Sequence, residues 1–180
     1  MDIIQFPYRL ATLDDLPELR ILMAASIRQY IGAYLNPAEV QASFEIMGVD
    51  TALVIDGTYF VIQQDQQIIG CGGWSRRATF YGGDQTAGRD ARLLDPATES
   101  ARVRAMYTHP DHGRKGIGRF ILSLCERVAR QEGFTSLELM ATIAGEPLYA
   151  SYGYNVTDRL QIPTSSGIIL PGARMTKTLI

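Results

Sequence analysis

Histidine and cysteine are scarce in this chain of 180 residues, which contains two of each. The cysteines, Cys71 and Cys125, cannot build a disulfide framework, and both lie in apolar stretches that predict small, buried core residues. A structural zinc site takes about four cysteine or histidine ligands at set spacings. The histidines, His109 and His112, do not complete such a set, so the sequence predicts no metal site.

A surplus of charge is also absent. Lysine and arginine number 17 and aspartate and glutamate number 19, which leaves a net charge of −2. This balance creates no overall positive field that would collect nucleic acid or an anionic membrane surface. The sequence therefore predicts no nucleic-acid partner, although a local basic cluster can still bind a compact anion.

Long apolar runs are lacking as well. No stretch approaches the roughly 18 apolar residues of a membrane span, and residues 1–10 lack the sustained apolar region of a secretory signal. Together with the unpaired cysteines, these absences predict a cytoplasmic protein with no membrane partner. The sequence also lacks repeats, and its length favours a single domain over residues 1–180.

Strand and helix signals are present throughout the chain. In the first half they predict a short strand at residues 8–11 and an amphipathic helix over residues 12–30. Asparagine followed by proline at residues 36–37 predicts a second helix start. Two runs rich in β-branched and aromatic residues, 58–63 and 68–74, predict an antiparallel hairpin.

Glycine interrupts the second strand of this hairpin at Gly70, Gly72 and Gly73, which predicts a bulge or the close approach of another backbone or a ligand. Residues 76–99 then form a long irregular stretch. A loop of that length inside a domain is usually functional or mobile, so we expect it to act as a lid.

The second half shows the clearest pattern: a strand at residues 101–108, a helix at 116–132 and a strand at 136–141. This order predicts a right-handed βαβ crossover with two parallel strands. Further elements are predicted at residues 146–151, 154–156 and 173–179. The expected fold class is α/β (α+β), with a mixed, mostly antiparallel sheet of six to seven strands flanked by helices.

A glycine-rich basic loop joins the first strand of the crossover to its helix. Such a turn gathers free backbone N–H groups and the positive end of the helix dipole. Formal charge is added by Arg114, Lys115 and Arg119, while Gly116 and Gly118 let a ligand approach the backbone. The loop is either a pyrophosphate cradle or a solvated basic turn whose glycines serve geometry.

Two well-known phosphate motifs do not fit this loop. A P-loop needs Lys-Ser/Thr where this chain has Arg119 and Phe120, and a dinucleotide fingerprint needs a third glycine where it has Ile121.

Two sequence blocks instead resemble the GNAT superfamily of N-acetyltransferases. The segment from Met106 to Leu122 is similar to its acetyl-CoA loop, and the segment from Leu148 to Tyr154 is similar to its "Leu-Tyr-x-x-x-Gly-Phe" block. The resemblance covers nearly the whole chain and is most specific over residues 101–154.

This sequence departs from the family pattern at three places. Gly113 stands where the family has glutamine or arginine, and Thr142 stands where it often has asparagine. The strand that carries a glutamate base in some members begins here with Arg102. The resemblance therefore assigns no base, which leaves His109, His112 or a relay through water.

The resemblance implies an acyltransferase that moves an acetyl group from acetyl-CoA to a primary amine by direct attack in a ternary complex. It implies that Tyr149 acts as general acid, because a tyrosine with a pKa near 10 can protonate a departing thiolate. It implies cofactor contacts from the strand, the loop and the end of the next strand, namely Met106, Tyr107, Thr108, Gly113, Arg114, Lys115, Gly116, Ile117, Gly118, Arg119 and Thr142.

The two parallel strands are expected to separate and leave a cleft between them. The acceptor is expected to enter this cleft from the side opposite to the cofactor. Candidate contacts are the aromatic residues Trp74, Tyr30 and Tyr34, although such residues more often serve packing. Arg104 is a further candidate, which either holds an acceptor carboxylate or is an ordinary surface charge. The acceptor itself stays open between a small amine, an amino acid, a peptide N-terminus and a lysine. Homodimerisation is common in such domains but no residue supports it.

A second hypothesis is a non-catalytic acyl-CoA-binding or sensor module with the same fold, suggested by the missing glutamate and by Gly113. A third is a general anion- or RNA-binding domain, against which the near-neutral charge argues.

Overall fold

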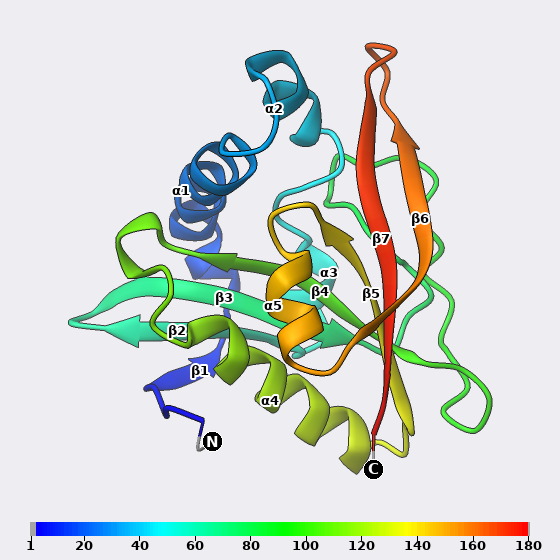
Figure 1. The fold of residues 1–180 in the computed structure, drawn as a ribbon. Helices are drawn as coiled ribbons and strands as arrows, with labels where there is room; N and C mark the ends of the chain where they lie inside the picture. Colours follow the sequence, from blue (N-terminus) through cyan, green and yellow to red (C-terminus); the bar gives the residue numbers. More distant parts are fainter. Residues whose placement is uncertain (1–2, 180) are drawn as a thin grey trace.

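One continuous seven-stranded sheet runs through the computed structural model, which describes residues 3–179 (Figure 1). Its strands are β1 (Tyr8–Leu10), β2 (Tyr59–Gln64), β3 (Gln67–Ser75), β4 (Ala101–Thr108), β5 (Ser136–Thr142), β6 (Asn155–Pro163) and β7 (Ile169–Thr178). The spatial order is β1-β2-β3-β4-β5-β7-β6, and only β4 and β5 pair in parallel. The predicted fold class, including the parallel βαβ unit, is confirmed.

Helices cover both faces of this sheet (Figure 1). They are α1 (Leu16–Ser26), α2 (Pro37–Ser43), α3 (Thr51–Ile55), α4 (Ile117–Gln131) and α5 (Glu146–Ser151). The apolar residues of α4 and α5 pack into the core on one face, and those of α1 and α3 pack into the core on the other. None of these helices is long and apolar enough to cross a membrane.

The predicted helix over residues 12–30 is divided into a 3₁₀ turn, α1 and a wide π turn at Ile27–Ile31. Asp15 ends the 3₁₀ turn and accepts hydrogen bonds from the Thr12 N–H (2.8 Å) and the Arg9 guanidinium (2.7 and 2.8 Å). The wide turn lets Ile27 and Ile31 both reach the core. The sequence did not predict α3, whose five residues are too few to show a helical period.

The glycines of β3 mark a bulge, as predicted. The pairing of β3 with β4 shifts register between Cys71 and Gly73, and a Cβ on Gly72 would lie 2.8 Å from the Met106 Cγ. Opposite this shift, Ala105 has a left-handed backbone with φ of 51°. The buried Tyr59 hydroxyl donates a 2.6 Å hydrogen bond to the Ala105 carbonyl oxygen and so stabilises the bulge.

The parallel strands β4 and β5 pair only at their beginnings, through Ala101 with Leu137 and Arg102 with Glu138. Beyond these two pairs the strands separate, while β5 continues to pair with β7 along its whole length. The edge of β4 from residue 103 to residue 108 is therefore left without a neighbouring strand.

The long stretch over residues 76–99 is attached to the sheet. The buried Arg104 guanidinium donates to the Gly82 carbonyl oxygen (2.7 Å) and the Thr79 carbonyl oxygen (3.3 Å). The same guanidinium forms an ion pair with the buried Asp50 carboxylate (3.0 Å), which also pairs with Arg89 (2.9 Å). We call residues 76–99 the lid loop.

Buried phenols and thiols are numerous in this fold. Burial raises the pKa of the Cys71 thiol to about 12 and raises the pKa of the Cys125 thiol further. Burial also raises the pKa of six tyrosines, namely Tyr30, Tyr59, Tyr107, Tyr149, Tyr152 and Tyr154.

We therefore expect the free energy of unfolding to fall as the pH rises above about 9. The unfolded chain loses thiol and phenol protons near pH 8.5 to 10, whereas the folded chain keeps them to higher pH. This stabilisation is complete below the unfolded pKa values and is lost as the pH approaches the folded ones, by about 1.4 kcal/mol per pH unit for each group. Urea unfolding at about pH 8 and about pH 10.5 measures the change.

Two matched variants test the role of burial. Tyr154→Phe removes a buried hydroxyl that has no partner in the described chain, and Tyr34→Phe removes the hydroxyl of a residue that is 56% exposed. Tyr154→Phe should reduce the pH dependence of the free energy of unfolding more than Tyr34→Phe does, because the Tyr154 side chain is buried. Equal urea midpoints at the two pH values would contradict the account.

Candidate active site

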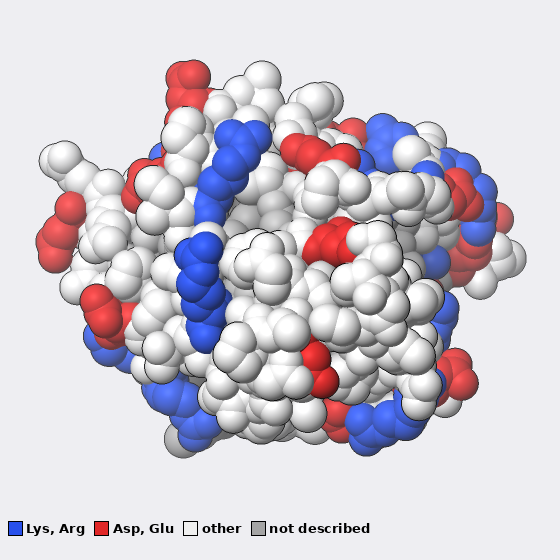
Figure 2. All heavy atoms as spheres, turned by 90° about the horizontal axis from the view of Figure 1, so that it is seen from above, with Lys and Arg blue, Asp and Glu red and all other residues white. Residues whose placement is uncertain are grey.

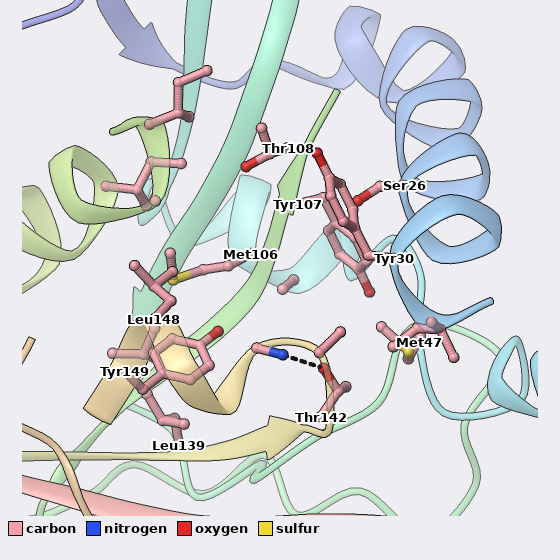
Figure 3. Close-up of a pocket in the computed structure, with 18 of the residues that line it drawn as sticks. Ser26, Tyr30, Met47, Met106, Tyr107, Thr108, Leu139, Thr142, Leu148 and Tyr149 are labelled. Carbon is pink, nitrogen blue, oxygen red and sulfur yellow. Dashed lines mark hydrogen bonds between the residues drawn. The ribbon is translucent and has the colours of Figure 1, made fainter. Parts of the chain in front are cut away.

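A cleft of about 950 Å³ opens where β4 and β5 separate. One wall is β4 with the loop that leads into α4, and another is the end of β5 with α5. The lining is completed by the end of α1 with the turn that follows it, the segment after α2, part of the lid loop and Ile4. Figure 3 shows the side chains from these elements that face the cleft.

The loop before α4 lines one end of this cleft and has the features of an anion cradle. Within residues 3–179, none of the backbone N–H groups of residues 114–119 donates a hydrogen bond to another protein group. Gly116 has φ of 92°, which a residue with a side chain adopts only with strain. A Cβ on Gly118 would lie 2.6 Å from the Leu148 side chain, so glycine lets α4 begin close against α5.

Positive charge surrounds this loop. Arg114, Lys115 and Arg119 all line the cleft, and the N-terminus of α4 adds the positive end of a 15-residue helix. On the face seen from above, basic side chains lie beside a hollow in the surface (Figure 2). The structure thus brings the seven predicted loop residues, 113–119, together at one end of one cavity.

The free edge of β4 supplies the next set of groups. The His109 N–H donates to the Ile69 carbonyl oxygen on β3 (2.9 Å). Because successive residues of a strand point their N–H groups to opposite sides, the N–H groups of Thr108 and Met106 point toward the cleft. Tyr107 differs, because its N–H is directed at β3 and its phenolic oxygen accepts a hydrogen bond from the Gly48 N–H (2.9 Å).

Tyr149 projects from α5 into the cleft, with its hydroxyl on the side of Met106 (Figure 3). The hydroxyl makes no hydrogen bond with another described residue. Burial raises the pKa of Tyr149, so the phenol holds its proton throughout the neutral range. Thr142 also lines the cleft, but its hydroxyl oxygen accepts a 3.2 Å hydrogen bond from the Gly145 N–H and shapes the turn after β5.

Three of the four predicted acceptor contacts line the cleft: Tyr30, Tyr34 and Arg104. The Tyr30 hydroxyl is buried without a partner in the described chain and lies over Gly113, where it would touch any added Cβ. Arg104 is bound to Asp50 and the lid loop, so the structure gives it a structural role rather than a free guanidinium.

Trp74 does not fit the acceptor prediction. Its side chain is 0% exposed, does not line the cleft and packs edge-on against Phe134 in the core. The register explains this placement, because Trp74 pairs with Val103 next to the point where β4 and β5 are still joined. Arg102, at the start of the same strand as Arg104, forms an ion pair with Glu138.

The sequence did not point to several apolar residues that line the cleft far from the basic loop. Phe80 and Tyr81 come from the lid loop, Ile46 and Met47 follow α2, and Met140 lies on β5. Phe80 and Tyr81 are adjacent aromatic residues in a glycine-rich loop, and this pattern could have indicated that they line a binding site. Nothing in the sequence singled out the other three.

No aspartate or glutamate of the described chain lines the cleft. Of the two histidines, only His112 lines it, and burial lowers the pKa of this imidazole. The His109 Nδ1 accepts a 3.2 Å hydrogen bond from the Asp111 N–H and so belongs to the turn.

Comparison with solved structures identifies the fold. A GCN5-related N-acetyltransferase from Rhodopseudomonas palustris is 18% identical, with 99% of each chain covered and a TM-score of 0.73. PaiA N-acetyltransferase from Thermoplasma acidophilum, solved with coenzyme A, is 13% identical over 97% of this chain and 99% of its own (TM-score 0.64). YncA from Salmonella typhimurium, solved with acetyl-CoA, is 18% identical over 98% and 95% (TM-score 0.64).

A comparison with curated protein sequences found no match. The family model of the acetyltransferase (GNAT) domain, however, matches residues 56–156, which include β2 to β5 and both helices beside the cleft. The resemblance read from the sequence is confirmed: this chain belongs to the GNAT acetyltransferase family.

Proposed function

We propose that the protein is an N-acetyltransferase that moves the acetyl group of acetyl-CoA to a primary amine by direct attack in a ternary complex. The family uses acetyl-CoA, and two of the structures with this fold contain it or coenzyme A. The observation that carries the proposal is the meeting of an anion cradle, a free strand edge and a protonated tyrosine in one cleft.

The residues present fit this cofactor. Its diphosphate is anionic, and the loop offers the unpaired N–H groups of residues 114–119 with three basic side chains. Its pantetheine arm carries amides, and the Met106 and Thr108 N–H groups are positioned to pair with them as a further strand would. The cofactor supplies an acetyl group activated as a thioester.

Acetyl transfer requires a polarised acetyl carbonyl, a proton for the departing sulfur and a neutral amine. The chain's own groups account for the first two of these requirements. A fixed N–H of the β4 edge can polarise the acetyl carbonyl, and such preorganised donors are worth about 3 to 4 kcal/mol in the transition state. Tyr149 can give its proton to the departing sulfur. The third requirement is a neutral amine. Since no carboxylate of the described residues lines the cleft, we assign the amine's proton to water that connects with bulk solvent.

A non-catalytic acyl-CoA-binding module is the second candidate. The specific observation in its favour is that no acidic residue of the described chain lines the cleft. Both candidates predict acetyl-CoA binding, and only the first predicts multiple turnovers with an amine.

We also propose a cytoplasmic location, because the two cysteines are free thiols and reducing compartments keep thiols unpaired. A homodimer stays a prediction.

Tyr149→Phe should lower kcat by about 10² or more, the usual contribution of a positioned general acid. The KM for acetyl-CoA should change little, because phenylalanine keeps the aromatic ring in place. Thiol release from acetyl-CoA, measured with a panel of amines, gives both constants. Tyr152→Phe is the matched control, since Tyr152 directly follows the same helix, packs on Arg119 and does not line the cleft.

An unchanged kcat in Tyr149→Phe would remove Tyr149 from the mechanism. If the wild-type protein bound acetyl-CoA but released no thiol with any amine, the sensor candidate would replace the enzyme.

Gly113→Ala should weaken acetyl-CoA binding by about tenfold, equivalent to about 1.4 kcal/mol. The new Cβ would collide with the Tyr30 hydroxyl and displace the loop, although the φ of −62° at Gly113 suits alanine. The double variant Gly113→Ala/Tyr30→Phe should bind like Tyr30→Phe alone, because the obstructing oxygen is gone. Isothermal titration of the four proteins measures the cycle, and a failure of the rescue would contradict this geometry.

A further inference from the structure

The far end of the cleft has a distinct chemistry. We call it the acceptor end and define it by Ile46, Met47, Phe80, Tyr81 and Met140, which line the cleft away from the basic loop. Met47, Tyr81 and Met140 also pack against the apolar cluster formed by α2, the segment after it and the β6–β7 hairpin. Any acceptor that reaches the acetyl group from this side meets thioether, aromatic and aliphatic surface.

The segments around the acceptor end are joined to one another. The Glu45 carboxylate accepts hydrogen bonds from the Ser165 N–H (2.9 and 3.0 Å) and hydroxyl (2.9 Å) at the tip of the β6–β7 hairpin. In the lid loop, the Gln85 amide donates to the Met47 carbonyl oxygen (2.8 Å) and the Thr86 hydroxyl donates to that of Glu45 (2.8 Å). In Figure 1, α2 stands beside the upper end of β7. These hydrogen bonds hold the segment after α2, the lid loop and the hairpin tip together around the acceptor end, which favours a small acceptor over an extended polypeptide.

Charge at the cleft favours an acceptor with no second cation. The ionised side chains that line it in the described chain are all basic: Arg104, Arg114, Lys115 and Arg119. The Asp50 carboxylate next to Arg104 is already shared between Arg104 and Arg89. A polyamine would therefore bury its additional ammonium groups without a partner, which is unfavourable in an apolar site.

We propose that the acceptor is a small primary monoamine with an apolar or aromatic body; this inference rests on the acetyltransferase function proposed above. The amine nitrogen forms the N–C bond as the C–S bond breaks, and the sulfur takes the proton of Tyr149. The surplus proton of the amine passes to water, from which Tyr149 regains its own. The products are an N-substituted acetamide and the thiol of coenzyme A.

The test compares four acceptors with the purified chain and acetyl-CoA: phenethylamine, spermidine, lysine and a short peptide with an N-terminal alanine. Thiol release and mass spectrometry of the product give kcat/KM for each. We expect phenethylamine to exceed each of the others by about tenfold or more, the discrimination that an apolar pocket commonly provides. A higher kcat/KM for spermidine, lysine or the peptide would overturn the inference.

Two matched variants at one position test the physical reason. Met47→Glu places a carboxylate at the acceptor end, and Met47→Gln has nearly the same shape without the charge. Met47→Glu should raise the spermidine-to-phenethylamine ratio of kcat/KM by about tenfold relative to Met47→Gln, because the new charge pairs with an ammonium group. Equal ratios in the two variants would contradict the charge argument.

A binding measurement separates failure of this inference from failure of the enzyme. Each amine is titrated into the protein saturated with coenzyme A, and its Kd is measured by calorimetry. If no amine were acetylated, the proposed function would fail. Tighter binding of phenethylamine than of spermidine would in that case still support an apolar monoamine as the ligand of the acceptor end. If acetyl transfer occurred but favoured a polycation, the function would stand and the acceptor class would be wrong. Binding of phenethylamine that is equal to or weaker than that of spermidine would also overturn the proposed acceptor class.

Discussion

The separation of β4 from β5 after two residue pairs determines the layout of this protein. The strands begin together at Ala101 and Arg102, where Arg102 pairs with Glu138. The bulge at Ala105 then lets β4 turn away, while β5 continues along β7. A left-handed alanine costs roughly 1 to 2 kcal/mol, and the hydrogen bond from the buried Tyr59 hydroxyl offsets part of that cost. The outcome is a strand edge inside the protein whose N–H groups have no partner among residues 3–179.

The remaining groups of the site follow from this separation, because each parallel strand is followed by its own helix. The basic loop lies between the end of β4 and α4, and Tyr149 lies on α5 just after the end of β5. Ligands of α/β folds commonly bind at the carboxyl ends of the strands for this reason. The other end of the cleft is lined by the segment after α2, the lid loop and β5, which are far apart in the chain. Glu45 and Gln85 join the first two of these to each other and to the β6–β7 hairpin.

How far the sequence predicted the structure depends on how local each signal is. β4 and α5 have the predicted bounds, and α4 lies within one residue of its prediction, because strand alternation and helical period are written in neighbouring residues. The glycines of β3 predicted an irregularity, but not that Ala105 would adopt the strained conformation opposite them. Trp74 was misplaced because the register between strands decides whether a side chain faces the cleft or the core. The apolar acceptor end depends on contacts between distant segments, so the sequence marks only its adjacent aromatic residues Phe80 and Tyr81 and not Ile46, Met47 or Met140.

Amide hydrogen exchange measured by NMR, with and without saturating acetyl-CoA, tests most directly whether the free edge of β4 is the binding surface. The account predicts that the N–H groups of Met106 and Thr108 and those of residues 114–119 exchange at least about tenfold more slowly with the cofactor, because hydrogen bonding lowers their access to solvent. The Tyr107 N–H, which is directed at β3, should change less. Saturable binding with unchanged exchange at Met106, Thr108 and the loop would contradict the central claim.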